Sequence, residues 1–218
     1  KRYFLWCGLK EDQLTYAPHA VDNEFFMADD ERRKREAMDI RHELGIGAEA
    51  RVFLFAGKLE AKKQPLELAE AFASLQSQAH LIYVGSGMLE DELKERYDPH
   101  PNIHFVGFQN QSKMPIWYRV ADVFCLPSRG PGETWGLAVN EALACGCQAI
   151  VSDRVGCAED LVKGREHGVV FRWSNTQSLH NALEDGLSSQ VAKRADIQLA
   201  DLTDFAAALI QETQDTQQ

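Results

Sequence analysis

The stretch DVFCLPSRGPGETWGLAVNEALACGCQAIVS, residues 122–152, carries the pattern that decides the fold. Its two ends, Asp122–Pro127 and Gln148–Ser152, are short apolar runs, and the run from Leu137 to Cys145 between them is long enough for a helix. Continuous rather than alternating apolar strands are typical of a parallel sheet that is covered on both faces. The stretch therefore predicts a strand–helix–strand unit with parallel strands.

The same alternation extends over most of the chain. Further strands are predicted at Arg51–Gly57, His80–Gly85, Asn102–Gly107 and Gly168–Phe171. Helices are predicted at Pro65–Ser77, Met88–Tyr97 and Thr176–Leu187, with a short helix that ends near Arg119. We therefore expect an α/β fold, a Rossmann-like parallel sheet with helices on both faces. In such sheets ligands bind beyond the carboxyl ends of the strands, and the loops of interest here all follow strands.

Composition narrows the function classes. The net charge of −10 argues against a nucleic-acid-binding surface, because phosphate backbones select clustered Lys and Arg. No run approaches ~18 consecutive apolar residues, so we predict no membrane-spanning segment. The five cysteines predict reduced, mostly buried thiols in a cytoplasmic protein. Cys145 and Cys147 lack the spacing and the paired histidines of a zinc site, so no metal is expected.

The two ends of the chain have other patterns. Residues 1–28 are expected to be an extended segment outside the strand–helix alternation. Asp29–Leu44 is a highly charged helix, for which a solvated face is the more plausible interpretation than a binding role. The tail from Arg194 to Thr213 has helical periodicity and is expected to pack onto another surface.

Two loops combine glycines with polar or charged residues. Gly57 is followed by Lys58 and Lys63, and cations at the entry to a helix suit a phosphate or diphosphate, although solvated lysines explain them equally well. Gly85 and Gly87 allow either a ligand or another backbone to approach closely, and a structural turn is the simpler explanation.

The loop after Pro127 carries two glutamates eight positions apart. Gly136 can open the following helix, whose first amides from Gly136 and Leu137 would face the same cleft as the lysines. Glu141 is the one charge in an otherwise apolar helix, and a carboxylate there suits two ribose hydroxyls or an internal ion pair with Arg or Lys. Glu133 either contacts the ligand or favours the helix dipole.

Together these residues resemble a known family. Gly57-Lys58-Leu59 with Lys63, the run ADVFCLPS at 121–128, and Glu133-x7-Glu141 around Trp-Gly-Leu are similar to family 4 retaining glycosyltransferases of the GT-B fold, over roughly residues 14 to 187. The resemblance implies two Rossmann-like domains, of which this chain matches the carboxyl-terminal, donor-binding one. It implies that 1–28 is a remnant or linker from a missing amino-terminal domain, 29–190 the nucleotide-sugar-binding domain and 191–218 a helical tail.

The resemblance also implies roles for single residues. The diphosphate would contact Lys58, where the family often has Arg, and Lys63; Glu133 would lie at the transferred sugar and Glu141 at the ribose. The implied catalytic residues are Glu133, Lys58 and Lys63. The implied donor-binding residues are Gly57, Gly85, Gly87, Gly107, Phe108, Thr134, Trp135, Gly136, Leu137 and Glu141. Cys157-Ala158-Glu159 departs from the family's usual Gly-x-Pro-Glu, which leaves the fifth loop without an assigned role.

The activity that follows is transfer of a hexose from a UDP or GDP sugar to an acceptor hydroxyl in glycan or polysaccharide synthesis, without cofactor or metal. A glycan or lipid-linked acceptor would be held by the missing domain, so this chain alone is expected to be inactive. Alternatives are another nucleotide-sugar enzyme of the same fold, a phosphorylase or an epimerase, and a non-catalytic nucleotide-sugar-binding module.

Overall fold

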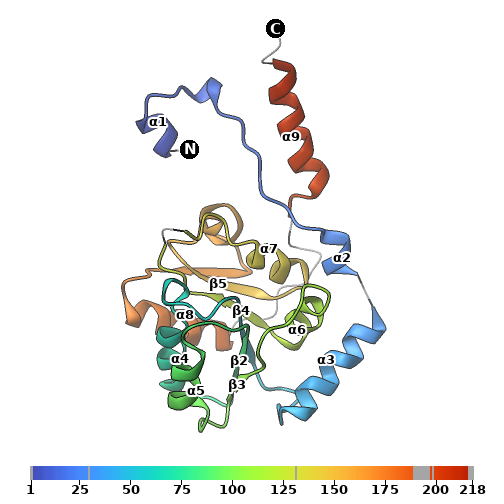
Figure 1. Cartoon of the computed structure of the whole chain (residues 1–218), viewed down its shortest axis with the longest axis vertical. Helices are drawn as coiled ribbons and strands as arrows, with labels where there is room; N and C mark the ends of the chain where they lie inside the picture. The colour runs from blue at the N-terminus through green and yellow to red at the C-terminus, as the bar shows by residue number, and fades with distance from the viewer. Residues whose placement is uncertain (1, 29, 131, 189–196, 198, 216–218) are drawn as a thin grey trace.

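The computed structural model describes residues 2–28, 30–130, 132–188, 197 and 199–215, and these build one parallel sheet with helices around it (Figure 1). The sheet has the order β3-β2-β1-β4-β5-β6, with parallel neighbours throughout. The strands are β1 (Val52–Ala56), β2 (His80–Val84), β3 (Ile103–Phe105), β4 (Val123–Leu126), β5 (Gln148–Ser152) and β6 (Gly168–Phe171). The order reverses between β1 and β4, which is where sheets of this kind open a ligand crevice. The predicted fold class is confirmed.

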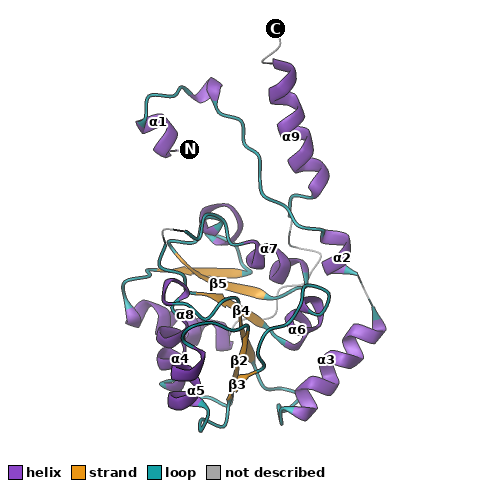
Figure 2. Ribbon diagram, viewed as in Figure 1, coloured by secondary structure: helices purple, strands orange, loops and turns teal. Residues whose placement is uncertain are grey.

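Helices cover both faces of the sheet (Figure 2). On one face lie α4 (Pro65–Ala73), α5 (Glu90–Tyr97) and α8 (Thr176–Ser188); on the other lie α3 (Glu31–Glu43), α6 (Met114–Val120) and α7 (Leu137–Ala144). Successive side chains of β1 point to opposite faces of the sheet. Phe53 packs on the face covered by α4 and Leu54 on the face covered by α7, and both are fully buried. This double burial explains why the strands are apolar without alternation.

Local sequence sets where the helices begin. Pro65 begins α4, a position at which its missing N–H is not needed. Gly136 precedes α7 with a φ of 98°, and a Cβ atom there would lie 2.9 Å from Val155 Cγ1. Only glycine combines that left-handed backbone with so close a neighbour. The start of α7 is thereby held against the loop that follows β5.

The predicted boundaries hold best for the buried strands. β5 and β6 begin and end as predicted, whereas α4 ends at Ala73, before the predicted Ser77. Ser74 ends α4 by donating its Oγ to Ala71 O at 2.7 Å. Three short helical turns complete the description: η1 (Glu11–Gln13), η2 (Ala61–Lys63) and the π-helical η3 (Ala158–Val162).

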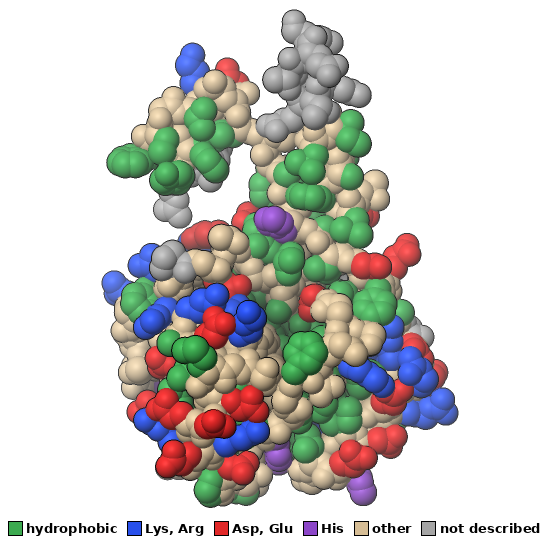
Figure 3. Space-filling view, viewed as in Figure 1, with side chains coloured by type: hydrophobic (Ala, Val, Ile, Leu, Met, Phe, Trp, Pro, Cys, Tyr) green, Lys and Arg blue, Asp and Glu red, His purple; other side chains and the backbone are tan. Residues whose placement is uncertain are grey.

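The segment before α3 is partly helical, not simply extended as predicted. It contains α1 (Arg2–Trp6) and α2 (Asn23–Met27), and α2 is tied to the sheet domain because Arg119 donates to Phe26 O at 2.9 Å. α1 and the last helix, α9 (Leu202–Asp215), lie away from the sheet in Figure 1. Figure 3 shows apolar side chains on both. The large exposed ones are Tyr3, Phe4, Trp6, Leu202, Leu209 and Ile210.

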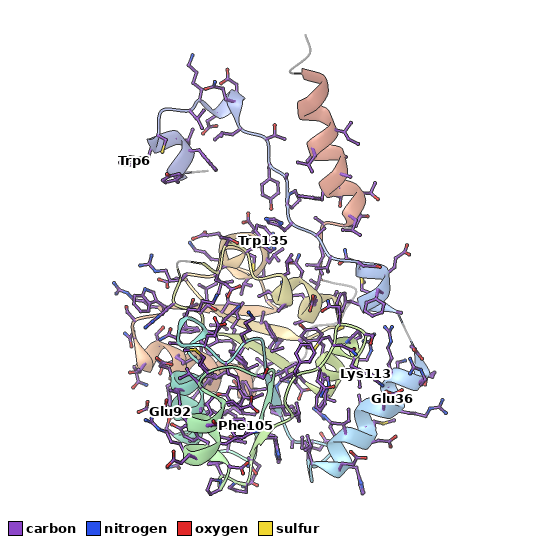
Figure 4. All side chains as sticks on the ribbon, in the orientation of Figure 1. Trp6, Glu36, Glu92, Phe105, Lys113 and Trp135 are labelled. Carbon is purple, nitrogen blue, oxygen red and sulfur yellow. The ribbon has the colours of Figure 1, made fainter. Side chains whose placement is uncertain are left out.

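α3 packs beside α6, and an ion pair joins α3 to the residue just before α6. Lys113, just before α6, lies 3.4 Å from Glu36 of α3, and Figure 4 shows the two side chains facing each other. The predicted solvated face of α3 is consistent with its sequence-local pairs, such as Arg32 with Glu36 at 2.8 Å. Within the described ranges no helix has the length and apolar character needed to cross a bilayer.

Candidate functional site

A cavity of about 590 Å³ lies at the carboxyl ends of β1 and β2, bounded on one side by α7. We call it the rim cavity. The loop after β1 contributes Gly57, Lys58 and Glu60, and α7 contributes Ala138 and Glu141. The other polar or exposed lining residues follow β2 and β3 or lie on α6: Ser86, Met88, Phe108, Gln109, Gln111 and Tyr118. The cavity is therefore where the strand order of the sheet places a ligand site.

Glu141 is held by two neutral hydrogen-bond donors. Tyr118 donates its hydroxyl to Glu141 Oε2 at 2.7 Å, and Gln111 donates its amide to Glu141 Oε1 at 2.7 Å. The sequence also allowed an internal ion pair of Glu141 with Arg or Lys, and no such pair is found among the described residues. A carboxylate with neutral partners keeps its negative charge available to a ligand.

Tyr118 is a fixed donor. The residue is 1% exposed, and its ring packs edge-on against Phe26 and Phe124 at centroid distances of 6.2 and 5.8 Å. Burial, and then the charge of Glu141, raise the pKa of Tyr118 well above its usual value. The phenol therefore stays protonated and donates a hydrogen bond to the carboxylate.

Glu133 is stabilised in a different way. Its Oε2 accepts from Lys63 Nζ and from Ser128 Oγ, the latter at 2.8 Å. The side chains of Lys63 and Glu133 are only 17% and 12% exposed, so the ion pair is largely enclosed. The alternative of a carboxylate that only favours the helix dipole does not fit, because α7 begins at Leu137 and the carboxylate turns to the lysine.

The two predicted lysines lie at the same edge of the sheet but in different surroundings. Lys58 lines the rim cavity, its side chain is 78% exposed, and Glu60 Oε1 lies 3.9 Å from its Nζ. Lys63 is not among the cavity-lining residues, and its ammonium group forms an ion pair with Glu133 instead. Lys58 is thus largely solvated at the edge of the cavity, whereas Lys63 is paired with Glu133, and the predicted diphosphate contact of each lysine stays a prediction.

Gly85 and Gly87 are required by backbone packing. A Cβ atom on Gly85 would lie 2.0 Å from Gly57 O, and one on Gly87 would lie 2.5 Å from Leu59 O. The two loops are joined there, since Leu59 N donates to Ser86 O at 3.0 Å. The glycines line the cavity, but their small size is explained by the neighbouring loop.

Several predicted donor-binding residues lie outside the cavity lining. Trp135 points toward the amino-terminal segment (Figure 4), where its ring lies 5.0 Å from that of His19 and its Nε1 donates to Asn140 at 2.8 Å. Thr134 packs its carbonyl against Gly156. Gly107 and Leu137 each precede a lining residue without belonging to the lining, and Gly136 is also outside it. Their roles toward a ligand stay predictions.

Sequence reasoning missed Tyr118, Gln111 and Ser128. Tyr118 lies in the apolar helix MPIWYRV, where a tyrosine is expected to serve the core. Gln111 follows β3 and Ser128 follows β4, so the rule that ligands lie beyond strand ends was the signal available for both. The contacts to the glutamates become visible only in three dimensions.

The thiols match their prediction as buried groups. Of the five free cysteines Cys7 is exposed, while the other four are buried. Burial raises the pKa of Cys157 to about 12 and also raises that of Cys125, which makes both poor nucleophiles. Within the described ranges no group of three or more His, Cys, Asp or Glu side chains is arranged to hold a metal.

The sheet order and the cavity at its carboxyl edge define a Rossmann-like α/β domain, and comparison with known proteins identifies the family. The family described as "Glycosyl transferases group 1" matches residues 37–200. The chain belongs to this family.

Curated relatives include D-inositol 3-phosphate glycosyltransferase 2 of Catenulispora acidiphila, 30% identical over 178 residues that cover 75% of this chain and 40% of the relative. The UDP-Gal:alpha-D-GlcNAc-diphosphoundecaprenol alpha-1,3-galactosyltransferase of Escherichia coli is 32% identical over 149 residues, which cover 64% of this chain and 37% of that enzyme. The chain thus spans about two fifths of the length of these relatives.

Solved structures share the fold. Anabaena Alr3699/HepE in complex with UDP and glucose superposes with a TM-score of 0.72 at 20% identity, over 99% of this chain and 59% of that one. The lipopolysaccharide outer core galactosyltransferase WaaB gives a TM-score of 0.75 at 16% identity, over 97% and 59%. At these identities the likeness concerns the fold.

Proposed function

We propose that this chain is the carboxyl-terminal, donor-binding half of a family 4 retaining glycosyltransferase with the GT-B fold. The whole protein would transfer a hexose from a UDP or GDP sugar to an acceptor hydroxyl in glycan or polysaccharide synthesis. The observation that carries this proposal is Glu141, a carboxylate with two neutral partners that lines the same cavity as Lys58. The arrangement fits a ligand that is anionic at one end and hydroxylated at the other.

The nucleotide end of the donor lies over Glu141 in this proposal. Leu137 begins α7, and Glu141 lies four residues further on, or ~6 Å along the helix axis. The first amides, from Gly136 and Leu137, can therefore face phosphate oxygens while Glu141 accepts hydrogen bonds from ribose hydroxyls. Phe108 is 73% exposed, lines the same cavity and offers a flat apolar surface to the base.

The sugar end lies toward Glu133. Lys63 binds Glu133 directly, so the proposed diphosphate and sugar contacts adjoin each other. When the glycosidic bond breaks, negative charge develops on the leaving diphosphate, and Lys58, Lys63 and the first-turn amides of α7 stabilise it without a metal. Glu133 orients the transferred sugar or stabilises positive charge on its ring.

The remainder of the whole protein supplies the acceptor site in this proposal. Trp6 on α1 is 84% exposed, and Leu202 and Ile210 on α9 are 52% and 56% exposed. Apolar side chains so exposed indicate surfaces that pack against further protein. The E. coli relative is named for a diphosphoundecaprenol-linked acceptor, which supports a glycan or lipid-linked acceptor here. The buried thiols support a reducing, cytoplasmic location.

Calorimetric titration of this chain with UDP, GDP and ADP tests the proposal. We expect saturable one-to-one binding of at least one of them, and no turnover of the corresponding nucleotide sugar by this chain alone. Absence of binding by all three nucleotides, with the chain folded by circular dichroism, would contradict the proposal. The ranking of the three also identifies the base.

A further inference from the structure

The two donors on Glu141 divide its hydrogen-bonding capacity evenly. Tyr118 occupies Oε2 and Gln111 occupies Oε1, each at 2.7 Å. An ionised carboxylate accepts about four hydrogen bonds, two on each oxygen. Each oxygen of Glu141 therefore keeps one acceptor position. Two hydroxyl groups on neighbouring carbon atoms are the ligand groups that match this pair of positions.

The two donors differ in how firmly they are fixed. Tyr118 is 1% exposed, and its ring is enclosed by Phe26 and Phe124. Gln111 is an exposed residue of the loop after β3. The last torsion of a glutamate side chain is broad, so a carboxylate needs an external contact to hold its plane. The enclosed hydroxyl of Tyr118 supplies that contact, whereas the exposed amide of Gln111 can move aside.

We propose that Tyr118 is a positioning residue that orients the Glu141 carboxylate for the two ribose hydroxyls, and that the site thereby selects ribonucleotides over 2′-deoxyribonucleotides. This inference rests on the proposed function, in which Glu141 binds ribose. It adds a residue that does not touch the nucleotide and a selectivity that nucleotide binding alone does not require. The raised pKa of Tyr118 keeps its phenol protonated, so the hydroxyl remains a hydrogen-bond donor to Glu141.

The test compares the dissociation constants of UDP and 2′-deoxy-UDP for the same chain, with GDP and 2′-deoxy-GDP used as well if GDP binds more tightly. Wild type should bind UDP at least about tenfold more tightly, the effect of one hydrogen bond to a charged group. In Tyr118→Phe this preference should fall to about threefold or less, because the carboxylate loses its fixed contact.

Tyr83→Phe is the matched control. Tyr83 is also 1% exposed, and its hydroxyl donates to Pro65 O at 2.7 Å, but it packs on the α4 side of the sheet and does not line the rim cavity. This variant removes the same atom from an equally buried tyrosine and should keep the full preference for UDP. Gln111→Ala should also keep most of it.

An unchanged preference in Tyr118→Phe, or tighter UDP binding than wild type, would overturn the inference. If no nucleotide binds wild type, the proposed function fails and this inference with it. If wild type selects UDP and Tyr118→Phe behaves as Tyr83→Phe does, only the positioning role fails. A readout independent of the variant's folding is wild-type chain labelled with 3-fluorotyrosine. Its Tyr118 resonance, assigned by replacing the other tyrosines, should shift more with UDP than with 2′-deoxy-UDP at saturation, and equal shifts would also overturn the inference.

Discussion

Polar side chains lie at both ends of the parallel strands, and those at the amino ends differ from Glu141 at the carboxyl ends in their hydrogen-bond partners. At the amino ends they bind one another: Arg41 donates to Asp122 at 2.9 Å, and His80 pairs with His104 at 2.9 Å. At the carboxyl ends Glu141 receives two neutral donors and lines a cavity. Mutually satisfied groups serve stability, whereas a group with remaining hydrogen-bonding capacity is available to a ligand. The comparison predicts that substitutions at one end change folding and at the other change binding.

The largest effect is expected at the amino ends. Asp122 Oδ2 accepts from both Arg41 and the amide of Val52, the latter at 2.8 Å. Asp122→Ala removes the carboxylate partner of a partly buried cation, which keeps its bond to Val120 O, and the acceptor of a buried amide. It should lower the free energy of unfolding by about 3 kcal/mol. Urea denaturation measures this, with Asp91→Ala on the exposed face of α5 as control. A loss below about 1 kcal/mol, or weaker UDP binding by the folded variant, would break the comparison.

The next effect concerns binding at the carboxyl ends. Glu141→Ala removes the proposed ribose contacts and should weaken UDP binding by about 1.5–3 kcal/mol, or more than tenfold. Glu92→Ala removes a carboxylate from α5, outside the rim cavity, and should leave the affinity unchanged. Calorimetry on both variants gives the comparison. Equal affinity of Glu141→Ala and wild type for UDP would show that Glu141 does not bind the ribose.

A smaller effect separates the two glutamates of the site. Glu133 neutralises Lys63 in the ligand-free chain, and Glu133→Gln should release that positive charge to the diphosphate. We expect UDP to bind about 0.5–1 kcal/mol more tightly, with an increase that diminishes at high salt. Weaker binding in this variant would show that Glu133 instead holds Lys63 in its binding position.

The smallest effect is a pH dependence at the amino ends. Burial lowers the pKa of His80 and His104 from the usual 6.5; Arg41 adds to the effect on His80, and His80 adds to that on His104. The unfolded chain therefore binds more protons, so stability contributed by the pair is complete above pH 6.5 and is lost as pH falls toward the folded-state pKa values.

His104→Gln should flatten this part of the pH profile of unfolding, measured in urea between about pH 5.5 and 8. His42→Gln, on the exposed side of α3, is the control and should leave the slope as in wild type. If the free energy of unfolding of His104→Gln depends on pH as in wild type, groups other than this histidine pair cause the acid sensitivity.

Buried strands could be predicted closely from the sequence. β5 and β6 are continuous apolar runs that end at polar or glycine residues, and such runs have few alternatives in a two-sided sheet. β3 is shorter than predicted, because the chain turns at Gly107 with a φ of 69°. The helices α1 and α2 were missed, since five residues are too few to show a helical period.

The site could be predicted in part. The spacing of Glu133 and Glu141, and the glycines around them, indicated a ligand loop after β4. The partners of Glu141 could not be predicted, because Tyr118 and Gln111 lie 23 and 30 residues away in the chain. The pairing of Lys63 with Glu133 spans 70 residues and depends on contact between the loops after β1 and β4, where Arg129 N donates to Lys62 O at 2.9 Å. Long-range contacts of this kind follow from the fold and carry no local signal.

A crystal structure of this chain with UDP tests the central claim most directly. The account predicts the nucleotide in the rim cavity, with ribose hydroxyl oxygens within about 2.5–2.8 Å of the two oxygens of Glu141 and the diphosphate at Lys58 and the start of α7. A nucleotide bound elsewhere, or one that places no hydroxyl on Glu141, would contradict it.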